Sequence, residues 1–131
     1  MAVCVRVLDE VNPGTKDAGW ELELPHARIT ARELIRSRVY QEVTEYNART
    51  SGAFRGLVQP TDAERVLNGY RLRAGRRIDW QAQYEKALEA FTRNSFLLLV
   101  DDHQLTELDE EVELRPGSEV TFLRLLPLVG G

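Results

Sequence analysis

The chain is poor in cysteine and lysine and has no long apolar run. Its one cysteine, Cys4, excludes an internal disulfide and is typical of a protein in the reducing cytoplasm. We expect Cys4 to be a buried small residue of the first strand rather than a reactive thiol. No apolar run approaches the roughly 20 residues of a membrane span. We also expect no signal peptide before the first strand. These absences predict a cytoplasmic protein with no membrane partner.

Among the 17 basic residues, only Lys16 and Lys86 are lysines. Codon bias in a GC-rich genome is one explanation for the excess of arginine. Selection against lysine, the acceptor of isopeptide chemistry, is the other, and both remain open.

The arginines are unevenly distributed along the chain. Residues 49–77 contain seven arginines and two carboxylates, a local charge of +5. Since the net charge of the whole chain is −4, the rest of the chain has a charge of −9. The acidic total gives no overall nucleic-acid footprint. The asymmetry predicts one basic face on an acidic body, with Arg76 and Arg77 as candidate protein contacts. Scattered, solvated arginines are the alternative.

Motifs of catalysis are missing as well. His26 and His103 have no cysteine or carboxylate partner at ligand spacing, so no metal site is expected. Gly-rich phosphate loops, nucleophile elbows and paired cysteines are absent from the sequence. The acidic pairs Asp101-Asp102 and Glu110-Glu111 are typical of solvated turns. We therefore predict a protein that is not an enzyme and holds no cofactor.

What the chain does contain is an ordinary globular composition. Its 131 residues, 43% apolar and 29% charged, suffice for one domain with its own core. Period-two alternation predicts strands at Ala2–Leu8 and Trp20–Leu24, joined as an antiparallel hairpin. A helix is predicted from Ile29 to Ala48, and a capping box of Thr30 and Glu33 marks its start.

The next segment, residues 49–94, interrupts this alternation and is predicted to be a helical insertion. A second capping box, Thr61 to Glu64, predicts a short helix that Asn68-Gly69 ends. Asp79 is expected to cap a third helix, Trp80 to Arg93.

The strands resume after the insertion. Phe96–Val100 is a short apolar run and predicts a central strand. Asp101-Asp102 predicts a tight turn into a short edge segment, His103–Thr106. Glu107–Leu114 is acidic and predicts an irregular segment or one helical turn.

The chain ends on a turn, a strand and a thin tail. Pro116 and Gly117 predict the turn, and β-branched and aromatic residues predict a strand from Glu119 to Leu126. Pro127 donates no ladder hydrogen bond and must end the strand. The predicted flexible tail consists of Pro127, Leu128, Val129, Gly130 and Gly131.

The order strand, strand, helix, strand, short strand, strand predicts an α+β fold of the β-grasp type, a mixed sheet with a crossing helix. FLLLVDDHQL and VTFLRLLPLVGG resemble the corresponding parts of ubiquitin-like proteins. LRPGSEVTF, followed by proline and the diglycine, resembles the small sulfur carriers. Residues 49–94 have no counterpart in either family. The arginines of the ubiquitin tail are replaced here by Pro127, Leu128 and Val129, which suggests a dedicated partner.

The resemblance implies a protein modifier. Gly131 would be adenylated by an activating enzyme that uses ATP, passed to a cysteine as a thioester, and joined to amines of target proteins. A conjugating enzyme and a deconjugating peptidase would be further partners. One alternative is a sulfur carrier that forms a C-terminal thiocarboxylate for cofactor synthesis. Another is an unconjugated β-grasp interaction module with an incidental diglycine.

One protein-binding surface is predicted from the last strand. If Val120 and Phe122 face the core, Leu123 and Leu125 face outward because side chains alternate along a strand. We expect Leu99 to join them, and an exposed leucine cluster is typical of a binding site. The alternative is that the helix at 80–93 covers these leucines.

Overall fold

The computed structural model describes residues 2–11, 19–49, 54–60, 63–66, 69–72 and 77–125. These residues form an α+β structure with one five-stranded mixed sheet, two short two-stranded sheets and two helices. The chain divides into two compact units. The first comprises Met1–Leu34 and Ala90–Gly131, and the second comprises Ile35–Glu89. Most of the predicted insertion therefore falls in the second unit.

The first unit begins with the predicted hairpin. β1 (Val3–Val11) pairs antiparallel with β2 (Trp20–Leu24), and Val3, Val5 and Val7 are buried. β1 extends three residues beyond the predicted end at Leu8. The extension pairs in parallel with β9 (Glu119–Arg124). This pairing explains why the strand continues through the charged residues Asp9 and Glu10.

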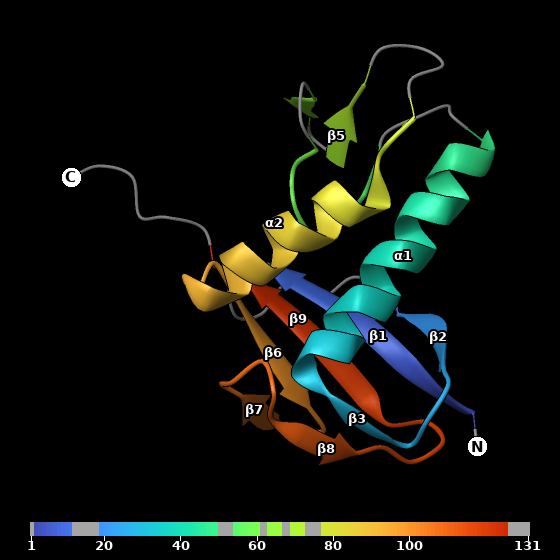
Figure 1. The fold of residues 1–131 in the computed structure, drawn as a ribbon, viewed down its shortest axis with the longest axis vertical. Helices are drawn as coiled ribbons and strands as arrows, with labels where there is room; N and C mark the ends of the chain where they lie inside the picture. Colours follow the sequence, from blue (N-terminus) through green and yellow to red (C-terminus); the bar gives the residue numbers. More distant parts are fainter. Residues whose placement is uncertain are drawn as a thin grey trace. The chain divides into compact units, whose positions relative to one another are not determined.

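The five strands lie in the order β2-β1-β9-β6-β7 (Figure 1). β6 (Phe96–Val100) is an interior strand as predicted, and β7 (His103–Leu105) forms the edge. β9 occupies the middle, parallel to β1 and antiparallel to β6, so the last strand returns beside the first. Asp101 and Asp102 have φ of 47° and 71°, the left-handed values of a two-residue hairpin turn.

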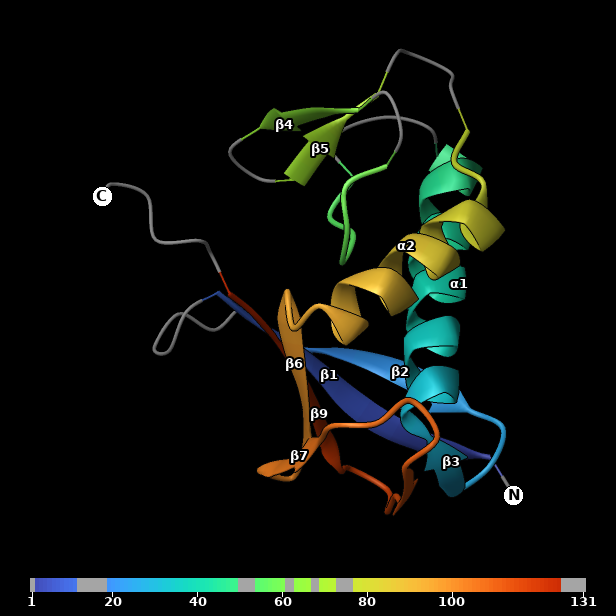
Figure 2. The ribbon, with the colours of Figure 1, turned by 60° about the vertical axis from the view of Figure 1, so that its left-hand side comes forward.

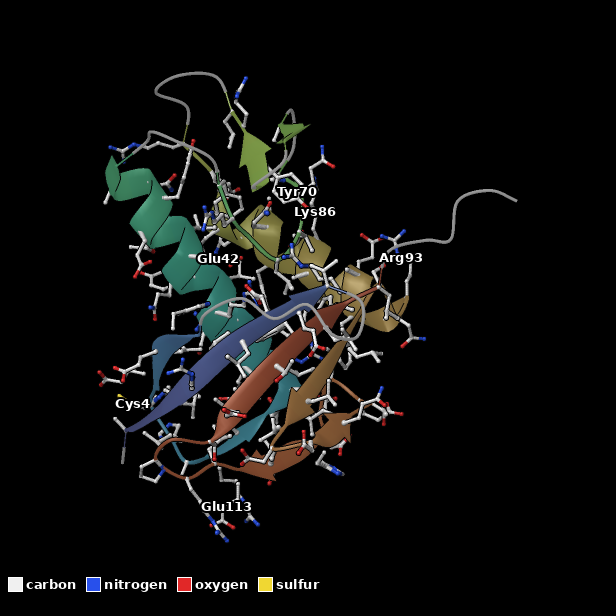
Figure 3. All side chains as sticks on the ribbon, turned by 180° about the vertical axis from the view of Figure 1, so that it is seen from behind. Cys4, Glu42, Tyr70, Lys86, Arg93 and Glu113 are labelled. Atoms are coloured by element: carbon white, nitrogen blue, oxygen red, sulfur yellow. The ribbon has the colours of Figure 1, made fainter. Side chains whose placement is uncertain are left out.

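The expected burial of Cys4 is wrong. Cys4 is exposed on β1, opposite Glu23 of β2 (Figure 3). Its neighbours Val3 and Val5 face the core, so a residue between them must face away. The period of the strand decides its position, and the usual burial of cysteine does not override it.

The structure contains a two-stranded sheet that the sequence did not predict. β3 (Arg28–Thr30) pairs antiparallel with β8 (Glu111–Glu113), where we expected helix and an irregular segment. The Leu114 amide also donates to the Ala27 carbonyl at 2.8 Å. Each strand has only three residues and is stabilised by a partner more than 80 positions away, so neither has a local signature.

The helix α1 (Ala31–Arg49) begins two residues later than predicted, at its capping box. The Glu33 amide donates to Thr30 Oγ1 at 3.2 Å, and the Thr30 amide donates to Glu33 Oε1 at 3.3 Å. The Ala31 and Arg32 amides donate to the carbonyls of Glu110 and Leu108. The capping box is confirmed, and the segment before β8 satisfies further amides of the first turn.

In the second unit, a hairpin replaces the predicted short helix (Figure 2). β4 (Glu64–Val66) pairs antiparallel with β5 (Gly69–Arg71). Phe54 extends this sheet through two hydrogen bonds with Tyr70, of 2.7 and 2.8 Å. Thr61 and Asp62 of the expected capping box lie outside the described residues. Residues 64–66, expected to be helical, are therefore strand, and Leu67 and Asn68 also lie outside the described residues.

The helix α2 (Trp80–Thr92) is capped as predicted, because Asp79 Oδ1 accepts from the Gln81 amide at 3.1 Å. Side chains of both helices also hold the backbone of residues 57–59, and Figure 3 labels two of them, Glu42 and Lys86. The bonds are Leu57 N to Glu42 Oε1 at 3.2 Å, Gln83 Nε2 to Val58 O at 2.7 Å, and Lys86 Nζ to Gln59 O at 3.2 Å. These polar side chains therefore satisfy backbone groups that no sheet pairs.

Glu42 also forms an ion pair with a buried arginine. Arg38 is 1% exposed, and its Nε lies 3.1 Å from Glu42 Oε2. We expect Glu42→Gln to lower the free energy of unfolding by about 3 kcal/mol, because it removes a charge that compensates a desolvated guanidinium. Urea unfolding measures this loss.

The matched control removes both charges, as Arg38→Met with Glu42→Gln, because a glutamine side chain can still accept from the Leu57 amide. With the guanidinium gone no desolvated charge is left uncompensated, so this double variant should be more stable than Glu42→Gln alone. A loss of less than about 1 kcal/mol for Glu42→Gln is the value expected of an exposed ion pair and would contradict this prediction.

Candidate functional site

The predicted orientation of the last strand is confirmed. Val120 and Phe122 are fully buried, and the residues between and after them, Thr121 and Leu123, are half-buried on the opposite face. The register pairs Leu123 with Leu97 and Thr121 with Leu99. Leu125, two residues after Leu123, is 40% exposed, and the alternation of the strand places it on the same face as the half-buried leucines. We define the outer leucine face as Leu97, Leu99, Leu123 and Leu125.

Leu8 limits this face on the β1 side. Leu8 pairs with Thr121 on the same side of the sheet but is only 8% exposed. A Cβ on Gly19 would lie 2.7 Å from Leu8 Cδ2, so the backbone at Gly19 packs closely against this leucine. Glu10 stands in register with Leu123, and exposed Gln104 with Leu99. An apolar centre with polar neighbours is the usual anatomy of a protein interface.

Leu97 and Leu8 were missing from the predicted surface. The signal for Leu97 was present in the sequence, because it stands two positions before Leu99 and shares its face. Leu8 could be placed only through its parallel partner Thr121.

The outer leucine face leads directly into the predicted reactive tail. The Leu125 amide donates to the Ser95 carbonyl at 3.0 Å, which holds the end of β9 beside the start of β6. The tail residues Pro127, Leu128, Val129, Gly130 and Gly131 lie outside the described residues. The tail is therefore adjacent in sequence to the leucines, and its role stays a prediction.

The predicted basic face is described only in part. Arg77 is exposed, as are Arg55 and Arg71. Arg73 and Arg76 lie outside the described residues. The proposed contacts of Arg76 and Arg77 stay predictions.

One acid–base contact was not visible in the sequence. His103 Nε2 lies 3.3 Å from Glu110 Oε2, and the Thr106 amide donates to Glu110 Oε1 at 2.9 Å. The Thr106 hydrogen bond holds the pKa of the Glu110 carboxyl below its ordinary value; partial burial opposes this and His103 assists it. No group of three or more metal-ligating side chains gathers within the described ranges.

This contact predicts a pH-dependent stability. The folded state favours charged Glu110, so its contribution is present above the ordinary pKa of 4.5 and is lost as the pH falls through the lowered folded value. We expect Glu110→Gln to reduce the free energy of unfolding at pH 7 and to have little effect near pH 3. Urea unfolding at both pH values measures the difference. Glu85→Gln, at an exposed position of α2, controls for the loss of one negative charge. An equal loss of unfolding free energy at both pH values for Glu110→Gln would contradict this prediction.

Comparisons of the chain with protein-family models, curated proteins and solved structures find no match. Neither helix of the described residues is long and apolar enough to cross a membrane.

Proposed function

We propose that this protein is a ubiquitin-like modifier of the β-grasp type. The observation that carries the proposal is the position of β9: it lies between β1 and β6, runs parallel to β1, and continues in sequence into the tail that holds Gly130-Gly131. A central strand cannot shift its register without disrupting two neighbours, so it is a firm support for a tail that enters another protein.

The chemistry takes place at the Gly131 carboxylate. One carboxylate oxygen attacks the α-phosphate of ATP held by an activating enzyme, and pyrophosphate leaves. A cysteine thiolate of that enzyme then displaces AMP and forms a thioester. An amine of the target displaces the thiolate and forms the isopeptide bond. Glycine suits this tail because it has no Cβ to obstruct a narrow enzyme channel.

The outer leucine face supplies the recognition surface in this proposal. It offers apolar contact area to the activating and conjugating enzymes and to a deconjugating peptidase. Arg76 and Arg77 would accelerate association with an acidic partner at low salt. A single cysteine, with no disulfide to form, suits work in the reducing cytoplasm.

The sulfur carrier remains the second candidate because LRPGSEVTF resembles that family, and the turn predicted within this stretch is present before β9. Gly117 has φ of 84°, and the Ser118 amide donates to the Arg115 carbonyl at 2.9 Å. This candidate shares the adenylate and differs afterwards, because sulfide sulfur replaces AMP and leaves a thiocarboxylate.

Intact mass spectrometry of the protein from its native host tests the proposal. A modifier should be found with Gly131 as its terminal residue and in covalent adducts with target proteins. A species heavier by the difference between sulfur and oxygen would favour the sulfur carrier. A chain that continues past Gly131, with neither adduct nor thiocarboxylate, would contradict both and leave the interaction module.

A further inference from the structure

In the second unit, α1 and α2 bring together an arginine and three aromatic rings. The Tyr40 and Trp80 rings meet edge to face, with centroids 5.1 Å apart and planes at 89°. Arg36 Cζ lies 5.1 Å from the centroid of Trp80, and the Tyr84 ring lies 6.2 Å from Trp80 on its own helix. We define the Trp80 cluster as Arg36, Tyr40, Trp80 and Tyr84.

The cluster is ordered and yet open to solvent. Tyr40 is 49% exposed, Arg36 is exposed, and Trp80 and Tyr84 are half-buried. Tyr40 and Leu125 are the large apolar side chains exposed within the described part of the chain. Rings held by one another offer contact area at low entropic cost, and Trp, Tyr and Arg are the residues enriched at binding hot spots.

Arg36 and Arg77 supply positive charge near the cluster, whereas the Glu33 carboxylate, one turn before Arg36, accepts from the Thr30 amide and hydroxyl in the capping box. Arg36 keeps its charge and its N–H donors while the Trp80 ring restricts its conformations. Exposed Arg77 precedes Trp80 by three residues, a chain reach of about 11 Å. The carboxylate nearest in sequence, Asp79, accepts from the Gln81 amide as the helix cap. Glu85 follows Tyr84 but is turned by about 100° around the helix.

We propose that the Trp80 cluster binds an acidic peptide segment of a partner protein. Apolar side chains of that segment would pack on the rings of Tyr40 and Trp80, and its carboxylates would pair with Arg36 and Arg77. The cluster belongs to the second unit, shares no residue with the outer leucine face, and does not depend on activation of Gly131. The site can therefore exist whether or not the protein is a modifier.

Tryptophan fluorescence gives a direct test in the full chain. Trp20 and Trp80 are the two tryptophans, so Trp20→Phe leaves Trp80 as the sole reporter. The probe is a tryptophan-free peptide that repeats Glu-Glu-Leu, and its control repeats Lys-Lys-Leu. We expect a saturable change in Trp80 emission with the acidic peptide alone, weakening as salt is added.

Matched variants identify the residues that bind. In the same background, Arg36→Gln should weaken peptide binding about tenfold, the effect of losing one charged contact that the bound peptide would cover. Arg93→Gln removes an exposed arginine outside the cluster and should leave binding unchanged. Tyr40→Ser should also weaken binding, and circular dichroism confirms that each variant stays folded.

Three results would overturn the proposal. The first is no change in Trp80 emission with the acidic peptide, or an equal change with the lysine peptide. The second is an emission change on dilution without peptide, which would assign the surface to self-association. The third is quenching by single-stranded oligothymidine but not by the acidic peptide, which would assign it to nucleic acid.

Discussion

Deletion of Gly131 should abolish ATP–pyrophosphate exchange by the activating enzyme that uses this protein. The exchange requires a carboxylate at the α-phosphate, and a chain shortened by one residue no longer reaches it. Gly131→Ala should have nearly the same effect, because its Cβ enters space that only glycine leaves free. Incorporation of labelled pyrophosphate into ATP measures the reaction.

Val129→Ala is the matched control for this deletion, since it trims a tail side chain and keeps both glycines. We expect it to support exchange. Undiminished exchange by the Gly131 deletion would contradict the modifier and the sulfur carrier together, because both begin with the same adenylate. Loss of exchange in all variants, with unfolding at low temperature, would indicate a folding defect, and thermal unfolding of each variant identifies it.

Phe122→Ala should lower the free energy of unfolding by about 3–5 kcal/mol, since it leaves a cavity in a packed core. Phe122 is fully buried in β9, with its ring centroid 5.9 Å from that of Phe96. Leu125→Ala should cost less than about 1 kcal/mol, because Leu125 is exposed at the end of the same strand. Urea unfolding compares the two variants directly.

The same pair of variants separates stability from recognition. Leu125→Ala should weaken binding to the activating enzyme while its unfolding curve stays close to that of the parent. Equal destabilisation by both substitutions would contradict the orientation of β9 and with it the outer leucine face.

The elements predicted correctly are those whose signals are contained in a few adjacent residues. The β1–β2 hairpin follows from alternation at Val3, Val5 and Val7, and the helix starts follow from Thr30 and Asp79. The Asp101-Asp102 turn and the two faces of β9 are of the same kind. In each case backbone geometry or side-chain period acts locally, so a short stretch of sequence carries the information.

The elements predicted wrongly depend on partners distant in sequence. β3 and β8 exist because they pair with each other, and the last residues of β1 are strand because β9 lies beside them. The Thr61–Asn68 stretch satisfied the rules for a short helix, yet residues 64–66 and 69–71 form a hairpin that Phe54 extends. The free-energy difference due to local propensity is smaller than the stabilisation from pairing with a neighbouring strand. Tertiary pairing therefore decides whether these segments become strands.

The sequence by itself determined the α+β class, the main strands, both helices and the diglycine that suggests the function. Only the tertiary structure decided which side chains meet. It placed Leu97 beside Leu123, Glu110 beside His103, and Arg36 over the ring of Trp80, which Tyr40 meets edge to face. The physical reason is that periodicity specifies the face on which a residue lies, whereas a contact also depends on the register between elements, and register is set by packing across the whole unit.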